Sequence, residues 1–190
     1  MPAPSYQEAD LERVRALAGP VERPQDLRRV LDALEYDEEW RDNYAIKSVR
    51  ASLHSQRITC IDGAILSYGL LELLFPSTDR RLLAIHRRDG KGEECGHCVA
   101  LYVSDGKVGS FSKSSYPGLG HRDPIYSDAA EVALSYADAY LKMGFTPLYF
   151  GEARLEEVAP DLDWRGGQAP LNVLSERLQA RYQYSFGLAS

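Results

Sequence analysis

The chain has 190 residues, a formal net charge of −6 and 44% hydrophobic residues, a composition typical of a globular protein long enough to bury a core. It has no dense basic patch and no run of about 20 apolar residues, so we expect neither a nucleic-acid partner nor a membrane span. The N-terminus lacks the basic and apolar regions of a signal peptide, and the three cysteines do not form a secreted disulfide framework. We therefore expect a cytoplasmic protein.

The first 45 residues are predicted to be mostly helical. The apolar spacing and the Gly and Pro punctuation give, in order, a helix over 8–18, a helix after Pro24, a solvated acidic connection over 35–42 and a helix over 44–54.

Residues 58–74 predict a buried central helix, because apolar side chains occupy almost all of its faces. Cys60 lies in its first turn, where the free N–H groups and the helix dipole favour a thiolate. A free cysteine is also often a small buried apolar side chain. Position alone leaves both interpretations of Cys60 open.

Strands dominate the part that follows the break at Phe75-Pro76-Ser77. Strands are expected over 81–86, 99–103 and 107–112, with a tight hairpin at Ser104-Asp105-Gly106 joining the last two. After them we expect a loop over 114–124, a helix over 129–143, a short strand over 148–150, a loop over 161–168 and a helix over 171–182.

This order of elements predicts an α+β fold, in which a central helix packs on a small antiparallel sheet and further helices flank it. We expect a single domain over 1–190. It would consist of an N-terminal helical region (1–45), a catalytic-type core (46–150) and a C-terminal helical extension (151–190).

Cys95-Gly96-His97-Cys98 has the letters of a disulfide-exchange motif. In that chemistry the first cysteine opens a helix after a strand, whereas a strand-like Val-Ala-Leu-Tyr-Val follows here. A zinc site on these residues would need a fourth ligand, and no second Cys/His pair stands at usable spacing. We therefore expect no metal and no cofactor.

His97 is better interpreted as the partner of Cys60. A thiol nucleophile needs an imidazole within hydrogen-bond reach, and a third polar group usually orients that ring. A cysteine that opens a buried helix and a histidine that begins a central strand meet this requirement.

That order resembles the transglutaminase-like (papain-like) superfamily. The matching segments are Thr-Cys60-Ile-Asp-Gly-Ala, Gly-His97-Cys-Val-Ala-Leu-Tyr-Val and Asp-Gly-Lys-Val-Gly-Ser-Phe-Ser112-Lys. Residues 55–145 are more closely similar to a bacterial family of uncharacterised transglutaminase-like proteins. Further segments that carry this likeness are Ser-Lys-Ser-Ser-Tyr-Pro-Gly-Leu and His-Arg-Asp-Pro-Ile-Tyr. The first 45 and the last 40 residues lie outside it.

The resemblance implies a papain/transglutaminase-like core with Cys60 as nucleophile and His97 as base. Ser112 stands where the superfamily usually has an aspartate that orients the histidine. The chain therefore has a Cys–His dyad, a triad completed by Ser112, or a carboxylate supplied by Asp123. Gln56, four residues before Cys60, is a candidate oxyanion donor together with the Cys60 N–H.

The function expected from these residues is cysteine-dependent acyl transfer on a peptide or a small amide, with hydrolysis favoured over transfer. Lys113 and Arg122 are candidates to bind a substrate carboxylate. The alternative is a catalytically inactive binding or scaffold protein of the same fold, since Ser112 carries no charge to stabilise an imidazolium. The sequence leaves the oligomeric state open.

Overall fold

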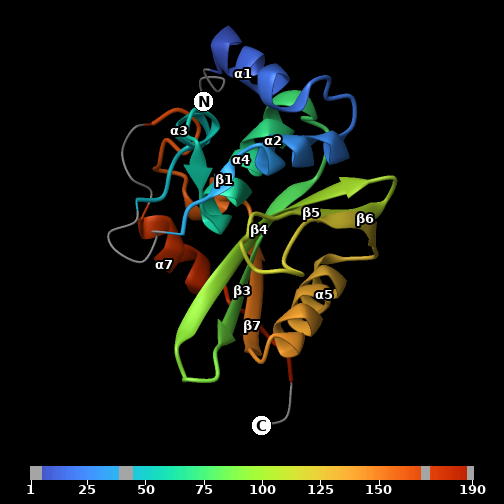
Figure 1. Ribbon diagram of the computed structural model, residues 1–190, viewed down its shortest axis with the longest axis vertical. Coiled ribbons are helices and arrows are strands. Elements are labelled where there is room, and N and C mark those ends of the chain that lie inside the picture. The colour runs from blue at the N-terminus through green and yellow to red at the C-terminus, as the bar shows by residue number, and fades with distance from the viewer. Residues whose placement is uncertain (1–5, 39–44, 168–171, 188–190) are drawn as a thin grey trace.

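The computed structural model describes residues 6–38, 45–167 and 172–187 (Figure 1). Its helices are α1 (Glu8–Ala18), the 3-10 helix η1 (Pro24–Leu27), α2 (Arg28–Asp32), α3 (Val49–Leu53), α4 (Cys60–Leu74), α5 (Ala129–Lys142), α6 (Leu155–Val158) and α7 (Val173–Gln179). Its strands are β1 (Glu35–Tyr36), β2 (Arg57–Ile58), β3 (Arg80–Arg88), β4 (Glu94–Ser104), β5 (Lys107–Phe111), β6 (Arg122–Tyr126), β7 (Thr146–Ala153) and β8 (Tyr184–Ser185).

A six-stranded antiparallel sheet organises the chain, in the order β6-β5-β4-β3-β7-β8. Helices cover both of its faces, with α4 on one and α5 on the other (Figure 1). Because side chains alternate along a strand, each central strand contributes side chains to two hydrophobic cores, one on each face of the sheet. Leu82, Ala84, Cys98 and Ala100 pack on the α4 side. Leu83, Ile85, Val99 and Leu101 pack on the α5 side.

Helix α4 begins at Cys60 because its N-terminus carries a capping box. The Thr59 hydroxyl accepts a hydrogen bond from the Asp62 N–H, and the Asp62 carboxylate accepts one from the Thr59 N–H at 3.1 Å. The helix ends at Leu74, two residues before Pro76. Its residues 62–71 are buried, so the Cys60 turn is held at one end of a core helix rather than on a mobile surface element.

The β4–β5 hairpin shows how local sequence fixes the centre of the sheet. Asp105 and Gly106 both have positive φ, 53° and 72°, as the expected tight turn requires. The turn pairs Ser104 with Lys107 and sets the register that brings Ala100 opposite Phe111. The ends of β4 and β5 nearest the site are therefore aligned by two turn residues.

The α+β expectation is confirmed, but the sheet is larger than predicted. Residues 122–124, expected in a loop, belong to β6, and residues 35–36 of the expected acidic connection form β1, which pairs parallel with β2. The helix expected over 44–54 covers only Val49–Leu53 within the described residues, and the one expected over 171–182 covers Val173–Gln179. Residues 39–42 and 44, and Leu171, lie outside the described residues.

None of the helices within the described ranges combines the length and the apolar character that a bilayer-spanning segment needs.

Candidate functional site

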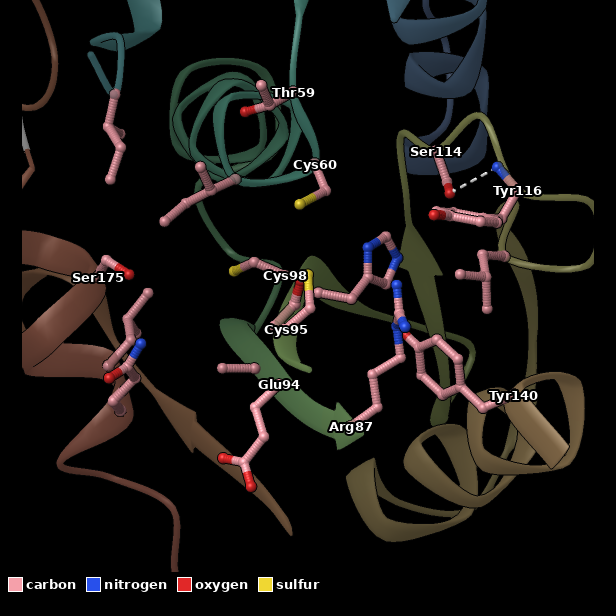
Figure 2. A pocket seen from close by; sticks show the side chains of 18 of the residues that line it. Thr59, Cys60, Arg87, Glu94, Cys95, Cys98, Ser114, Tyr116, Tyr140 and Ser175 are labelled. Atoms are coloured by element: carbon pink, nitrogen blue, oxygen red, sulfur yellow. Dashed lines mark hydrogen bonds between the residues drawn. The ribbon is translucent and has the colours of Figure 1, made fainter. Parts of the chain in front are cut away.

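A cavity of about 450 Å³ opens where α4 begins against β3 and β4, a size within the range of ordinary small-molecule sites (Figure 2). Its wall comes from segments far apart in the sequence: β1, the first turn of α4, β3, β4, the 114–119 loop, α5 and α7. Cys60 and His97 both line it. The structure thus brings the two sequence-predicted reactive side chains to one pocket.

Cys60 is the first residue of α4 and is partly exposed to this pocket. Burial raises the pKa of the Cys60 thiol, and the backbone N–H groups of Cys98, Ile61 and Cys60 itself oppose that rise. No hydrogen bond joins the Cys60 sulfur to His97 within the described part of the chain. The resting thiol is therefore neutral, surrounded by donors that would stabilise its anion.

His97 is buried and its tautomer follows from its neighbours. Its Nε2 lies 2.9 Å from Ser112 Oγ, and Ser112 Oγ donates its single proton to the Leu119 carbonyl oxygen at 2.5 Å. Ser112 must therefore accept from His97, which places the proton of the neutral ring on Nε2. Since the ring lines the pocket, Nδ1 is the nitrogen left to take up a proton.

The electrostatic surroundings keep that ring neutral. Burial lowers the pKa of His97 to about 3, and the positive charges of Arg87 and Arg122 add to the effect. The Tyr136 ring packs edge-on against the imidazole with centroids 5.7 Å apart. At neutral pH His97 is thus an uncharged base.

A second chain of hydrogen bonds holds Ser112 in place. The Ser112 N–H donates to His121 Nδ1 at 3.0 Å, and His121 Nε2 lies 3.1 Å from the Asp32 carboxylate. The only carboxylate of this network therefore reaches His97 through His121 and the backbone of Ser112, not directly. No carboxylate contacts the His97 ring among the described residues.

The other two predicted site residues lie elsewhere. Asp123 is on β6 with 75% of its side chain exposed, and its carboxylate pairs with Arg28 at 3.7 Å instead of His97. Gln56 is exposed, does not line the pocket, and contributes its backbone carbonyl to β1 through the Glu35 N–H at 2.9 Å. The structure does not bring either side chain to Cys60.

Lys113 and Arg122, the two residues expected to bind a substrate carboxylate, instead make hydrogen bonds within the fold. The Lys113 ammonium donates to the Leu31 and Leu34 carbonyl oxygens. Arg122 stacks on Tyr136 at 4.1 Å and donates to the 118–120 loop and to Ser135. Neither side chain is among those that line the pocket.

Sequence reasoning missed Tyr36, Arg87 and Tyr140, three polar side chains that line the pocket. Tyr36 belongs to the stretch interpreted as a solvated connection, and Arg87 is one of two adjacent arginines at the end of a strand. Tyr140 belongs to the helix expected over 129–143, where an aromatic side chain at helical spacing is typical of a core residue. One signal could have identified Arg87. Side chains alternate along a strand, so Arg87 lies on the same face of β3 as the buried Leu83 and Ile85.

All three cysteines are free and line the same pocket. Cys95 and Cys98 lie on one extended strand, β4, where three residues span about 10 Å, beyond the roughly 7 Å between Cα atoms that a disulfide allows. Within the ranges that the structure describes, no three His, Cys, Asp or Glu side chains gather as a metal site would require.

The comparisons with known proteins are sparse. No family model and no curated protein matches the chain. One solved structure with a similar arrangement is titled "Crystal structure of a TGase", with 14% identity and a TM-score of 0.40. The match covers 69% of this chain and 39% of that chain, so this chain spans much less than the length of the matched protein.

Proposed function

We propose that the chain is a cysteine-dependent acyl-transfer enzyme of the transglutaminase-like kind that hydrolyses an amide, with Cys60 as nucleophile and His97 as proton carrier. One observation carries the proposal. Cys60 and His97 line one pocket, and His97 has its Nε2 occupied by Ser112, which leaves Nδ1 for the thiol proton. These placements support the assignment of Cys60 as nucleophile, His97 as base and Ser112 as orienting group, the three roles that covalent acyl transfer requires.

In the first half-reaction the Cys60 sulfur forms a bond to the amide carbonyl carbon while His97 Nδ1 takes the thiol proton. The carbon–nitrogen bond then breaks, and His97 returns the proton to the leaving nitrogen. In the second half-reaction water attacks the thioester carbonyl carbon and His97 takes a proton from that water. The carbon–sulfur bond then breaks, His97 returns the proton to the sulfur, and the carboxylic acid leaves the regenerated Cys60 thiol. Each proton that His97 accepts is given back, so the ring needs no net charge between turnovers.

Because the resting thiol and imidazole are both neutral, the proton would move during attack rather than beforehand. An apo site with no hydrogen bond between sulfur and ring is compatible with this, since such contacts often tighten only when substrate is bound. Ser112 would fix the orientation of His97 without supplying charge. The expected cost is a slower acylation step than a carboxylate-assisted triad gives.

The developing oxyanion needs donors that point into the pocket. The backbone N–H groups of the first turn of α4 are the first choice, because Cys60 has its own N–H directed toward the sulfur. For a second donor we propose the hydroxyl of Tyr36, a residue that lines the pocket and interacts electrostatically with Cys60. Gln56 does not serve this role in the proposal.

The test is acylation by an activated acyl ester, followed by mass spectrometry of the intact protein and of its peptides. Cys60→Ala should abolish the adduct, and His97→Gln should slow its formation by about 100-fold or more. Cys95→Ser is the matched control, because Cys95 is a free thiol in the same pocket. An adduct on Cys95 or Cys98 that persists in both Cys60→Ala and His97→Gln would refute the proposal.

A binding protein without turnover is the second candidate. Two observations favour it: burial raises the pKa of Cys60, and the group that His97 contacts is a serine rather than a carboxylate. A protein of this kind would form at most a stoichiometric adduct and release no product over many equivalents. If the protein hydrolyses many equivalents of an amide and the Cys60→Ala variant does not, the protein is an enzyme rather than a binding protein.

A further inference from the structure

Arg87 is a buried cation that forms no ion pair with any acid of the described residues. Its side chain lines the pocket and the residue is only 6% exposed. It makes no ion pair or hydrogen bond within the described residues, whereas its strand neighbours Arg81 and Arg88 pair with Glu152 and Glu94. A buried charge without a partner is costly, so it points to a group that the pocket receives.

Three aromatic rings hold the guanidinium. Its central carbon lies 3.8 Å from the ring centroid of Phe145 and 5.3 Å and 5.4 Å from those of Tyr140 and Tyr116. Rings that pack against a guanidinium stabilise it through its flat faces and leave its edges, which carry the N–H donors, free. None of these ring contacts uses an N–H donor of Arg87, so its guanidinium keeps donors that can bind a carboxylate with two hydrogen bonds.

A second donor stands next to this cation. The Tyr140 hydroxyl oxygen is buried and has no hydrogen-bond partner within the described residues. It interacts electrostatically with Arg87, Cys60 and Cys95, and it lines the same pocket. Two unpaired donors, one on β3 and one on α5, therefore line the same pocket as the thiol, and Figure 2 shows Arg87 and Tyr140 lying together in it.

The register of the sheet puts Arg87 near the base as well. Ile85 on β3 lies opposite His97 on β4, so Arg87 is two residues further along β3 on the same face. Diagonal neighbours of this kind have side chains within reach of each other. A group bound to Arg87 would consequently lie close to the atoms that we propose for the reaction.

We propose that Arg87, assisted by Tyr140, binds a carboxylate of the substrate, so that the pocket takes amides carrying one free carboxylate near the carbonyl that Cys60 attacks. The reaction itself rests on the proposed function, but the carboxylate site does not depend on turnover. A carboxylate is favoured over a phosphate because the charged groups lining the pocket, among the described residues, are Arg87 and Glu94, and Glu94 already pairs with His86 and Arg88. One guanidinium matches one monoanion.

The remaining wall indicates what the rest of the substrate looks like. Its apolar part comes from the segment before α3, from α4, from the 114–119 loop and from α7, through Ile46, Ile61, Leu119 and Leu178 respectively. A short aliphatic or aromatic chain between the amide and the carboxylate fits this lining, and a cavity of about 450 Å³ admits only a small molecule or the end of a peptide.

The first experiment compares mono-4-nitrophenyl glutarate with its neutral methyl ester as acyl donors for Cys60. The two probes share the leaving group and differ in one charge. We expect the carboxylate probe to react at least about 10-fold faster, the ratio that one charge-assisted hydrogen-bonded pair supports. Arg87→Met should remove the preference and Tyr140→Phe should reduce it. Arg81→Gln, which removes a positive charge from the same strand outside the pocket, should leave it unchanged.

The second experiment measures equilibrium binding of glutarate to Cys60→Ala, a variant that is unable to form a thioester. Binding that disappears in Cys60→Ala/Arg87→Met supports the carboxylate site even if no probe acylates Cys60, in which case only the proposed function fails. Equal acylation by both probes, together with no glutarate binding, overturns the inference and leaves the proposed function standing. Since Arg87→Met also alters the packing on three rings, Arg87→Lys is the second variant. It keeps the charge and should retain part of the preference.

Discussion

Ser112 accepts a hydrogen bond from His97 because its own hydroxyl proton is committed to the Leu119 carbonyl oxygen. The two contacts are 2.9 Å and 2.5 Å long, and the second is too short for two oxygens without a proton between them. This pair of bonds decides which nitrogen of His97 carries the proton of the neutral ring and which is left to accept one. It also means that the loop carrying Leu119 takes part in orienting the base.

Replacing Ser112 by Ala is therefore expected to impair acylation without unfolding the protein. His97 Nε2 would lose its acceptor, the ring would sample the other tautomer, and the rate of Cys60 acylation should fall by about 10-fold to 100-fold. The nitrogen chemical shifts of the imidazole should report the mixed tautomers directly. Ser110→Ala is the matched control, since Ser110 is a buried serine on the same segment that bonds Tyr136 instead of His97. An unchanged rate in Ser112→Ala would show that its hydroxyl does not orient the base.

The pH dependence of Cys60 alkylation follows from the raised pKa of its thiol. Burial disfavours the thiolate, so at pH 7 iodoacetamide should react with Cys60 more slowly than with free cysteine, and the rate should still be climbing above pH 9. Because the pKa of His97 is lowered to about 3, no inflection near pH 6.5 is expected. The measurement is the rate of adduct formation at Cys60 between pH 5 and 10, in Cys95→Ser. A plateau that begins below pH 6 would reveal a preformed thiolate–imidazolium pair and contradict this expectation.

The parts of the fold that sequence predicts are those set by local chemistry. The hairpin at Asp105-Gly106 needs only two residues with positive φ, and the start of α4 needs only the Thr59–Asp62 capping box. Helix α5 was expected over 129–143 and is observed over Ala129–Lys142 for the same reason, a cap at Asp128 and a glycine after the end. In each case the residues that predict the element also make the interactions that form it, and they are neighbours in the sequence.

The parts that sequence does not predict depend on contacts between distant segments. Strand β8 has only two residues and β6 contains Pro124, so neither is recognisable in the sequence. They form because β5 and β7 offer free edges. The same limit applies to the site. Asp123 and Arg122 looked available in the sequence because their partners, Arg28 and the 118–120 loop, are recognisable only in the folded chain. Arg87 looked ordinary because its lack of an ion-pair partner among the described residues can be recognised only in the folded chain.

Removing the charge of Arg87 should raise the pKa of His97. Burial is the main cause of its low value, and the positive charges of Arg87 and Arg122 contribute in the same direction. Arg87→Met removes one of these two charges, so protonation of the ring becomes less unfavourable and the titration moves upward from about 3. Glutarate bound to Arg87 should also raise the pKa of His97, because its carboxylate offsets the positive charge of the guanidinium. The check is the pH titration of the imidazole carbon-bound protons by NMR, with Arg81→Gln as control. If the pKa of His97 falls, or changes neither in Arg87→Met nor on binding glutarate, the charge of Arg87 does not act on His97.

The contact between α4 and the segment after Ser112 should be sensitive to a single methyl group. A Cβ added at Gly63 would lie 2.9 Å from Lys113 Cβ and 3.4 Å from Leu31 Cδ2, so either α4 or the Ser112–Lys113 segment must move. The gain of about 1 kcal/mol from replacing a helical glycine should be outweighed by an overlap that costs about 1–3 kcal/mol. We expect Gly63→Ala to lower the free energy of unfolding and the rate of Cys60 acylation together.

Gly69→Ala distinguishes loss of stability from loss of site geometry. Gly69 lies in the same helix, where an added Cβ would overlap Val49 and come within 2.8 Å of the Tyr6 hydroxyl oxygen, away from the residues that line the pocket. It should lower the free energy of unfolding, measured in urea, but leave the acylation rate of the folded protein close to that of the parent. If both substitutions slow acylation equally, the close approach at Gly63 has no special role in placing Cys60 against the segment that holds His97.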